Sequence, residues 1–346
     1  MTNVYDGFGQ LSASTLAMGG ASRALSHQYD LDGNRKRITH PPAIISTHPH
    51  LGLLTVFYDY TYDGLGRPTS VVNAGGHHLA GWAYDAMGRL EKLSRIAPAF
   101  SLYGYDSVSR PASITHDLYG TAYDLTLGFT YNPASQVQGR SSSNGLYAAN
   151  SAYEVVRPYS ANGLNQYTAA GPAAFAYDSN GNLTSDGSST FVYDVENRLV
   201  SASGAKTAAL VYDPLGRLFQ VSGGASPLQF LHDGDSLVAE YESADVRPRL
   251  YVHGVGADVP VIWFEGGGGG RGLYTDHQGS IVAAAHPTNG YLAINGYDAW
   301  GIPNAGNQGR FGYTGQAWIP ELGMVLQGQV LLADDRAVHA GGSDRV

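Results

Sequence analysis

Asp276, His277 and Ser280 are the three residue types of a hydrolase that uses a serine nucleophile. In such an enzyme the carboxylate orients the histidine, and the histidine takes the proton from the serine. Asp276 and His277 are adjacent, however, and adjacent residues of a strand point to opposite faces, so Asp276 would not orient His277. The sequence around Ser280 also lacks the Gly-x-Ser-x-Gly elbow of many hydrolases. We therefore predict hydrogen bonding at a turn for these residues, and no catalytic residue in the chain.

Two further segments could hold a ligand, and in both the spacing favours a structural interpretation. The polar run 178–186 places oxygen ligands at calcium-loop offsets, but Leu183 stands where that loop needs glycine and Ser189 where it needs glutamate. The glycines at 266–270 are not followed by the residues of a phosphate loop, so they predict a flexible linker. Four histidines elsewhere in the chain also lack the carboxylate spacing of a metal site: His48, His50, His77 and His78. We expect no metal and no cofactor.

The overall composition limits the function classes. Only 14% of the 346 residues are charged, and the frequent glycines and tyrosines are weak helix formers, so a helix-rich enzyme fold is not expected. The net charge of −9 argues against binding to nucleic acid or to an anionic membrane. The absence of cysteine excludes disulfides and thiol catalysis. No apolar run is long enough for a membrane span and no signal peptide is recognisable, so the localisation stays open.

An internal repeat organises most of the chain. Alternating residues precede the motif Tyr-Asp-x-x-Gly-Arg, which predicts a strand, and the Asp-x-x-Gly core predicts a four-residue turn. Each repeat is therefore expected to be a β-hairpin. A further copy has His232 in place of the tyrosine. The copies begin at Tyr5, Tyr29, Tyr62, Tyr84, Tyr105, Tyr131, Tyr177, Tyr193 and Tyr212.

A single hairpin cannot bury a core, so successive hairpins must pair into one long sheet. We predict an all-β fold, a repetitive antiparallel ribbon of hairpins. The motif residues that flank the turns are Tyr62, Asp63, Gly66, Arg67, Tyr84, Asp85, Gly88, Arg89, Tyr193, Asp194, Arg198, Tyr212, Asp213, Gly216 and Arg217. The expected core residues are Tyr62, Tyr84, Tyr105, Tyr177, Tyr193, Tyr212, Leu199, Leu218, Trp263, Phe264 and Trp318.

These repeats resemble those of the RHS/YD-repeat family, which includes bacterial RHS proteins, the C subunits of insecticidal toxin complexes and the teneurins. Three later segments resemble successive blocks of the RHS repeat-associated core: RLYVHGVGADVPVIWFEG, LYTDHQGSIVAAAHPTNGYLAINGYDAWGIP and GRFGYTGQAWIPELG. The most specific block has the motif residues Tyr274, Asp276, His277, Gly279 and Ser280. We expect repeats over 1–245, with an irregular insertion or disruption at 41–56, and the core over 246–323.

The resemblance implies part of a hollow, teneurin-like YD shell. In the family, a β-ribbon spirals around a toxic C-terminal domain, which is released by self-cleavage near a DPxG segment. We therefore expect a non-enzymatic structural fragment of the encapsulating shell of a polymorphic toxin. Its expected partners are the rest of such a shell or its toxin cargo, and secretion-system components. The alternative is a carbohydrate-binding or adhesive module, since the recurrent tyrosines could stack on sugars.

Residues 324–346 depart from the family pattern. That pattern would continue with aromatic residues and end in DPxG, whereas this chain reads MVLQGQVLLADDRAVHAGGSDRV. Compatible codons for this segment, read one base later, encode WYYKARYYSPTTGRFMQADPIGY. We therefore expect an out-of-frame tail in a truncated or frameshifted member of the family, without the toxin and without the aspartates of the self-cleavage segment.

Overall fold

The structure is a computed structural model that describes residues 1–43, 55–96, 98–148, 158–242, 248–254, 259–266, 269–286, 291–298, 301–327 and 330–332. These residues form strands, turns and short 3-10 helices, and none of them lies in an α-helix. The first strands are β1 (Thr2–Tyr5), β2 (Leu11–Met18), β3 (Ala21–Tyr29), β4 (Arg35–Thr39), β5 (Phe57–Tyr62), β6 (Pro68–Asn73), β7 (His78–Tyr84), β8 (Leu90–Arg95), β9 (Phe100–Tyr105), β10 (Pro111–Asp117), β11 (Leu125–Tyr131) and β12 (Val137–Ser142).

The later elements continue the same alternation of strands and turns. The strands are β13 (Tyr159–Ala161), β14 (Tyr167–Ala170), β15 (Ala173–Ala174), β16 (Ala176–Tyr177), β17 (Leu183–Ser185), β18 (Ser189–Tyr193), β19 (Leu199–Gly204), β20 (Ala208–Tyr212), β21 (Leu218–Ser222), β22 (Leu228–Asp233), β23 (Ser236–Tyr241), β24 (Arg249–His253), β25 (Pro260–Phe264), β26 (Gly270–Thr275), β27 (Ile281–Ala285), β28 (Leu292–Ile294), β29 (Ala317–Ile319), β30 (Met324–Gln327) and β31 (Val330–Leu332). The 3-10 helices are η2 (Thr121–Tyr123), η3 (Gly145–Tyr147) and η4 (Tyr313–Gly315).

The strands pair antiparallel with their neighbours in sequence. Strands β1 to β12 form one 12-stranded sheet, β16 to β28 form a 13-stranded sheet, and β13–β15 and β29–β31 form 3-stranded sheets. Each hairpin therefore adds to the preceding one without a crossover. The predicted all-β ribbon of antiparallel hairpins is confirmed.

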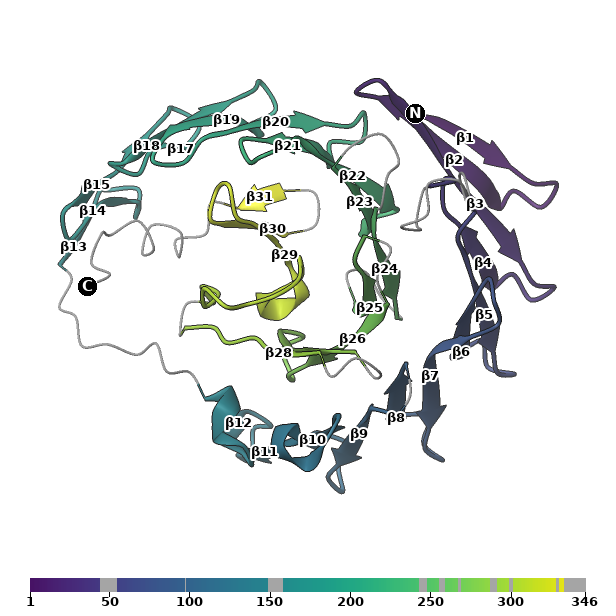
Figure 1. Ribbon diagram of the computed structural model, residues 1–346. Coiled ribbons are helices and arrows are strands. Elements are labelled where there is room, and N and C mark those ends of the chain that lie inside the picture. Colours follow the sequence, from purple (N-terminus) through teal and green to yellow (C-terminus); the bar gives the residue numbers. More distant parts are fainter. Residues whose placement is uncertain are drawn as a thin grey trace.

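A β-bulge lies at the tyrosine that precedes most of the motif turns. The strand register shifts at Thr61/Tyr62 between β5 and β6, at Ala83/Tyr84 between β7 and β8, and at Val211/Tyr212 between β20 and β21. A bulge bends its strand and increases the right-handed twist. Because the bulge recurs from hairpin to hairpin, we attribute the continuous curvature of the ribbon to it, and the ribbon winds into a spiral (Figure 1).

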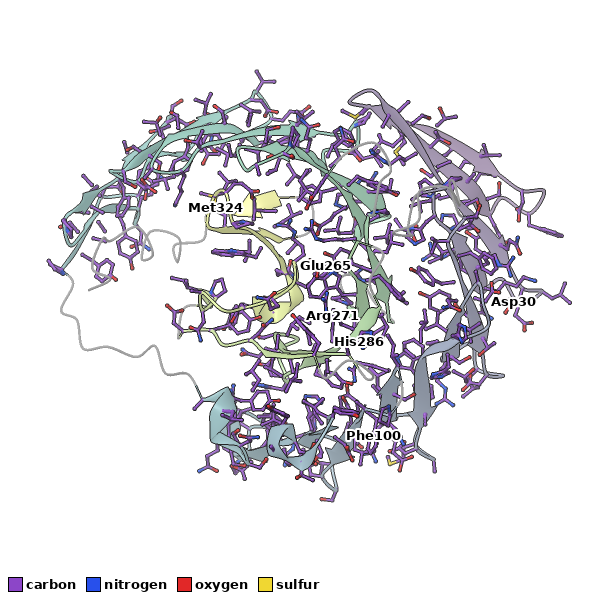
Figure 2. All side chains as sticks on the ribbon, viewed as in Figure 1. Asp30, Phe100, Glu265, Arg271, His286 and Met324 are labelled. Carbon is purple, nitrogen blue, oxygen red and sulfur yellow. The ribbon has the colours of Figure 1, made fainter. Side chains whose placement is uncertain are left out.

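The spiral overlaps itself, so that part of the molecule has two layers. Strands β22–β28, which we call the inner layer, lie inside strands β3–β11, the outer layer (Figure 1). Residues 301–327 and 330–332 fold inside the inner layer and form the central segment, with β29–β31 (Figure 1). Met324, labelled in Figure 2, lies in this central segment. Because the layers overlap, a ribbon that is only one sheet thick can form apolar cores between its successive layers.

The apolar cores join layers that are far apart in the sequence. Between β3–β4 and β22–β24, the core is formed by Leu25, Ile38, Leu231, Val238, Ala239, Tyr241 and Leu250. Between β5–β8 and β24–β25, it is formed by Tyr58, Val71, Leu79, Ala80, Trp82, Leu93, Val252, Val261 and Ile262. The central segment packs against both β16–β21 and the inner layer through Phe311, Ala317, Ile319, Leu322, Met324 and Leu326.

The residue pattern of each strand matches the number of faces that it buries. In β3 of the outer layer, buried and solvent-accessible residues alternate, as expected for a strand with one covered face. In β23 and β25 of the inner layer, buried residues follow one another almost without interruption. These two strands read LVAEY and PVIWF because both of their faces are covered.

Several sequence-based expectations require correction. Of the predicted core residues, Leu199, Leu218 and Trp263 are buried. The predicted core tyrosines are only half-buried, because they stand at the edge of the ribbon next to the turns; Phe264 and Trp318 are half-buried too. The glycine run is not a linker throughout, since Gly270 begins β26 and is buried. Most of the irregular segment 41–56 and most of the tail lie outside the described residues.

Candidate functional site

The turn after each motif tyrosine is built around one aspartate. In the turn of Asp63, its Oδ1 accepts hydrogen bonds from the amides of Leu65 (2.9 Å) and Arg67 (3.0 Å). Its Oδ2 binds the Arg67 guanidinium, with Nε at 2.8 Å and Nη2 at 2.6 Å. Gly66 has φ +73°, a conformation that costs glycine little. One carboxylate thus closes the turn and neutralises the arginine; we call this arrangement a YD turn.

The other motif residues occupy the same places in their own turns. Asp85 binds Arg89, Asp194 binds Arg198, and Asp213 binds Arg217. Gly88 and Gly216 have positive φ, whereas Asn197 replaces glycine with φ 61° in the turn after Tyr193. Asparagine tolerates this left-handed conformation, which explains how the degenerate motif YDVENR keeps the turn.

Successive YD turns are connected along one edge of the ribbon. The Tyr84 hydroxyl donates to the Pro68 carbonyl (3.0 Å), directly after the preceding turn, and the Arg67 guanidinium lies 4.2 Å above the Tyr84 ring. The same contacts recur in the next hairpin. Tyrosine hydroxyls join Tyr29 to Leu11, Tyr62 to Arg35, Tyr105 to Leu90, Tyr131 to Pro111, Tyr177 to Tyr167, and Tyr212 to Leu199. The motif tyrosine and arginine therefore hold one hairpin to the next.

Removing one of these hydroxyls is expected to weaken the ribbon locally. The Tyr212 hydroxyl donates to the Leu199 carbonyl at 2.7 Å in a half-buried position. We expect Tyr212→Phe to lower the free energy of unfolding by about 1 kcal/mol, the net value of such a bond. Urea denaturation measures it, with Tyr5→Phe as the control, because Tyr5 is 58% exposed in the first hairpin. Equal effects of the two substitutions would contradict the proposed role of the hydroxyl.

The same turn also occurs at places that our list of motif copies does not include. Asn73 and Asn162 each accept the two amide hydrogen bonds that aspartate accepts in a YD turn. Two turns of the predicted core region are of this type as well, since Asp276 and Asp298 bind the amides four residues later. Tyr297 even donates to the Ile281 carbonyl, directly after the Asp276 turn. The available signals were an asparagine in place of the aspartate at Asn73 and Asn162, a threonine in place of the tyrosine before Asp276, and the Tyr-Asp-x-x-Gly copy at Tyr297.

Asp276, His277 and Ser280, for which we predicted hydrogen bonding at a turn and no catalysis, lie together in this turn. Asp276 and His277 follow β26 in the turn, so our strand-based argument against their cooperation used the wrong local structure. Asp276 Oδ1 accepts from the amides of Gln278 and Ser280, both at 2.9 Å. The His277 ring packs on Phe129 of β11, at 4.8 Å between centroids, and joins the two layers.

The remaining residues of that block are structural in the same way. Ser280 Oγ accepts a hydrogen bond from the Thr314 amide at 3.1 Å and thereby fixes the central segment. Gly279 has φ +86° in the turn. Tyr274 is buried between the layers, with the Arg95 guanidinium 4.7 Å from its ring centroid. None of these contacts aligns a nucleophile with a base.

A serine-histidine pair that sequence reasoning missed lies between the layers. Ser101 Oγ is 2.8 Å from His116 Nδ1, and His116 Nε2 is 3.0 Å from the Thr275 carbonyl oxygen. Both side chains are fully buried, and the Arg95 guanidinium donates to Ser101 at 2.6 Å. Burial lowers the pKa of His116 to about 3, so the imidazole is neutral. The pair links the layers and has no access for a substrate.

The candidate ligand segments form no metal site in the described part of the chain. Asp178 closes its own turn with Asn180 and Asn182, whereas Asp186 binds Lys206 and caps the next connection. Their carboxylates therefore serve separate turns. Within the described ranges, no group of three or more histidine, aspartate or glutamate side chains is arranged to hold a metal ion. No helix in those ranges has the length and hydropathy of a membrane span.

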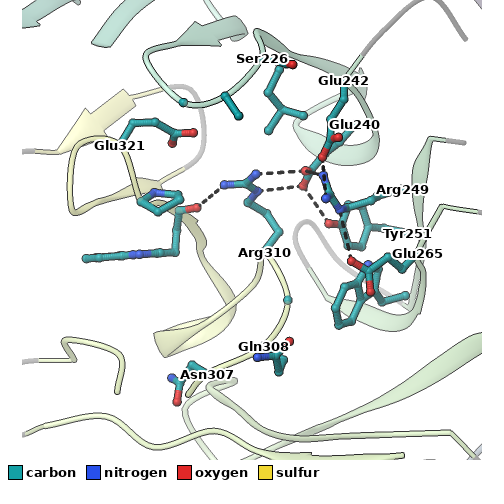
Figure 3. Close-up of a pocket in the computed structure, with 17 residues that line it drawn as sticks. Ser226, Glu240, Glu242, Arg249, Tyr251, Glu265, Asn307, Gln308, Arg310 and Glu321 are labelled. Atoms are coloured by element: carbon teal, nitrogen blue, oxygen red, sulfur yellow. Dashed lines mark hydrogen bonds and ion pairs between the residues drawn. The ribbon is translucent and has the colours of Figure 1, made fainter. Parts of the chain in front are cut away.

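A buried charge network joins the inner layer to the central segment. Glu240 of β23 is fully buried and accepts two hydrogen bonds from Arg310, from Nε at 2.9 Å and from Nη2 at 3.1 Å. The Tyr251 hydroxyl donates to the same carboxylate at 2.7 Å, and Arg310 Nη1 donates to the Trp318 carbonyl at 2.6 Å. Figure 3 shows Arg310 pointing from the central segment to Glu240, with Glu321 across the pocket.

This network forms one wall of a pocket of about 370 Å³ between the inner layer and the central segment. Burial alone would raise the pKa of Glu240, but the charge and hydrogen bonds of Arg310 hold that pKa below its usual value. Burial likewise opposes the charge of Arg310, and Glu240 outweighs it and raises the pKa of the guanidinium. Both groups are therefore ionised, and each is stable in the core only with the other. Farther along the wall, Glu265 binds Arg271 at 2.6 Å (Figure 2).

Comparisons with known proteins support the interpretation of the motif as a repeat. The family model described as RHS Repeat matches residues 62–98, which contain two complete YD turns. A tRNA3(Ser)-specific nuclease WapA from Bacillus spizizenii is 30% identical over 173 residues, and a tRNA nuclease WapA from Bacillus subtilis is 28% identical over 176 residues. These matches cover 46% of this chain and 7% of each WapA protein.

Solved structures share the fold over almost the whole chain. A Photorhabdus luminescens Tc holotoxin pore with a TccC3 mutation matches with a TM-score of 0.53 and 13% identity, over 95% of this chain and 21% of that chain. A crystal structure of TcdB2-TccC3-Cdc42 matches with the same TM-score and identity, over 96% of this chain and 22% of that chain. The chain is an RHS/YD-repeat protein. It spans less than a quarter of the length of each of these relatives.

In this RHS protein, the YD turns form the repeated part of the site and the Glu240–Arg310 pair forms its buried part. The sequence motif identified the YD turns, because all residues of a turn are close together in the sequence. The pair was missed, although a single glutamate in the apolar run Ser236–Tyr241 and an arginine in the GRFGYTG block were visible. A charged residue inside an apolar strand indicates a buried partner, but it does not indicate which one.

Proposed function

We propose that this RHS protein is a wall segment of a shell that encloses a protein cargo, and that it does no chemistry of its own. The observation that carries the proposal is the geometry of the YD turns, in which the recurrent polar residues hold hairpin to hairpin. The tyrosine hydroxyls are bonded to backbone carbonyls of the preceding repeat, and the arginines are paired with the aspartates of their own turns. The WapA relatives are named as tRNA nucleases, which supports a toxic domain as the cargo of the parent protein.

The carbohydrate-binding alternative is less favoured by the same geometry. A sugar that stacks on an aromatic ring needs an open ring face. In the repeats, Arg67 covers Tyr84, Arg89 covers Tyr105, and Arg198 covers Tyr212. The hydroxyl groups of these tyrosines are bound to backbone carbonyls. We therefore assign the tyrosines to the wall.

We also propose that residues 324–346 are translated out of frame. The proposal is supported by the sequence, which lacks the tyrosines and turns of the preceding repeats. In this view the cargo and the self-cleavage segment are encoded in the other frame.

Protection of a cargo tests the wall function. A small reporter domain fused after Val346 is digested by a protease, in parallel with the free reporter. We expect at least tenfold slower cleavage of the fused reporter. The matched control is the same fusion with Arg310→Met, which removes the buried contact of the central segment and should restore fast cleavage. Equal cleavage rates for the free and the fused reporter would contradict an enclosing function.

A further inference from the structure

Four glutamates line the pocket between the inner layer and the central segment, and three of them are each bound by an arginine. The three pairs are Glu240 with Arg310 at 2.9 Å, Glu242 with Arg249 at 2.6 Å, and Glu265 with Arg271 at 2.6 Å. The fourth carboxylate belongs to Glu321, which lies across the pocket from Glu240 and Glu265 (Figure 3). The pocket is therefore negatively charged on the side of Glu321.

Glu321 forms no ion pair within the described part of the chain. Its Oε2 atom is buried and has no hydrogen-bond partner among those residues. Figure 3 shows Arg310 between Glu321 and Glu240, but the Arg310 guanidinium donates to Glu240 and to the Trp318 carbonyl. A carboxylate that is withdrawn from water without a partner costs free energy. A bound cation would offset that cost.

The Glu321 carboxylate stands on a tight turn of the central segment. The amides of Leu322 and Gly323 donate to the Ile319 carbonyl at 3.1 and 2.9 Å, and Leu322 is fully buried. On the facing loop, a Cβ atom at Gly224 would lie 3.2 Å from Glu321 Oε1, so a side chain there would crowd the carboxylate. A binding group on such a fixed backbone loses little conformational entropy when a ligand binds.

A buried hydrogen-bond donor lines the same pocket. Trp263 is only 3% exposed, and its Nε1–H group has no acceptor among the described residues. A buried indole N–H group usually has a hydrogen-bond partner. The pocket thus contains an unused acceptor at Glu321 and an unused donor at Trp263. A ligand that carries both a cation and a carbonyl oxygen satisfies the two groups.

The walls of the pocket favour a guanidinium group as the cation. Guanidinium is planar, binds a carboxylate through two parallel hydrogen bonds and stacks on aromatic rings. Both modes already occur here, since Arg310 holds Glu240 through two N–H groups and Arg271 lies 4.4 Å from the Trp263 ring centroid. The half-buried ring of Trp318 offers a further aromatic surface in the wall.

We propose that this pocket binds arginine, with Glu321 as the partner of the guanidinium group and Trp263 Nε1 donating to a carbonyl oxygen of the ligand. The pocket volume of about 370 Å³ lies in the range of small-ligand sites. The side chains of Glu242 and Glu265 are 58% and 42% exposed, so solvent reaches the pocket. This inference concerns a site of the described chain and does not rest on the proposed enclosure of a cargo.

A metal ion fits the pocket less well than arginine does. Calcium needs six to eight oxygen ligands, and several of them are usually carboxylates. Three of the four carboxylates of the pocket are bound by arginines, which leaves Glu321 alone for a metal. Arginine, in contrast, needs one carboxylate.

Isothermal titration calorimetry of the full chain with N-acetyl-L-arginine amide tests the proposal. We expect saturable binding. N-acetyl-L-citrulline amide, which has a similar shape without the charge, should bind at least about tenfold more weakly. Propylguanidine, which has the guanidinium group without a carbonyl oxygen, should bind at least about threefold more weakly. Free L-arginine is titrated in parallel, and the tighter binder identifies either an arginine residue of a polypeptide or the free amino acid as the ligand.

Substitutions in the protein locate the site. Glu321→Gln should weaken the binding of N-acetyl-L-arginine amide at least about tenfold. The matched control is Glu196→Gln, which removes the same charge from a side chain that is 63% exposed in a YD turn, and it should leave the binding unchanged. Circular dichroism and a thermal melt establish that the variants are folded. If Glu321→Gln does not fold, Glu321→Asp replaces it, since the shorter side chain keeps the charge and should also weaken binding.

Binding that the substitution of Glu321 weakens and Glu196→Gln leaves unchanged supports the proposal. If N-acetyl-L-arginine amide does not bind, or if the citrulline compound binds equally well, the proposal is wrong. Equal effects of the substitutions at Glu321 and Glu196 overturn it as well, because the ligand is then held elsewhere on the surface. Equal binding of propylguanidine overturns the role of Trp263.

Discussion

Arg310→Met is expected to be the most destabilising single substitution that we consider in this protein. It removes the bidentate partner of Glu240 and leaves a carboxylate buried with Tyr251 and the more distant Arg249, at 3.7 Å. Breaking a buried ion pair in this way costs about 3–5 kcal/mol. The central segment should then detach from the inner layer, because Arg310 also binds the Trp318 carbonyl. Urea denaturation measures the loss, and acrylamide quenching of tryptophan fluorescence measures the exposure of the segment.

A matched control separates this effect from the loss of any arginine. Arg198 forms an ion pair with Asp194 in a YD turn, but its side chain is 31% exposed. Arg198→Met should therefore cost less than about 1 kcal/mol. The double variant Glu240→Leu/Arg310→Met removes both buried charges and should recover most of the stability that Arg310→Met loses. A similar loss for Arg310→Met and Arg198→Met would disprove the central role of the buried pair.

The ribbon was predictable because its information is local. The motif Tyr-Asp-x-x-Gly-Arg contains the turn, the bulged tyrosine and the ion pair within six residues, so each copy can be interpreted without its neighbours. The same locality explains why the motif tyrosines were predicted as core residues although they are only half-buried. The sequence shows that Tyr84 precedes a turn, but only the structure shows that Pro68 and Arg67 of the previous hairpin hold it at the edge.

The overlap of the layers was not predictable in the same way. It depends on contacts such as Arg35 with Asp233 and His116 with the Thr275 carbonyl, which join segments that no periodicity relates. The small bend of each bulge also decides where the spiral meets itself, and such bends add up over many hairpins. The continuous apolar runs of β23 and β25 indicate two covered faces, but they do not identify the covering strands.

The junction of the two layers should make the protein sensitive to mild acid. His27 and His40 of the outer layer are buried and His253 of the inner layer is half-buried around Asp233, which also binds Arg35 at 2.7 Å. Within the described residues, the Nδ1 atoms of His40 and His253 have no hydrogen-bond partner. Protonation would therefore place new positive charges beside Arg35, with only one carboxylate among these groups to balance them.

The direction of the effect follows from the pKa values. Burial lowers the pKa of His40 and of His253 from 6.5 to about 4. The unfolded chain therefore binds protons at a higher pH than the folded chain does. The stability is complete above pH 6.5 and is lost as the pH falls from 6.5 toward 4. At pH 5 each of these histidines should cost ~2 kcal/mol, and the buried His232, with a pKa of about 4, adds to the loss.

Unfolding free energies at pH 7.5 and pH 5.0 test this prediction. The wild-type chain should lose several kcal/mol between the two conditions, and His40→Gln should lose about 2 kcal/mol less, because one proton-binding site of the unfolded chain is gone. His77→Gln is the control, since His77 lies exposed at the edge of the outer layer. The comparison uses the difference between the two pH values, so a constant destabilisation by the substitution cancels. If His40→Gln and His77→Gln show the same pH dependence, the junction is not the source of the acid sensitivity.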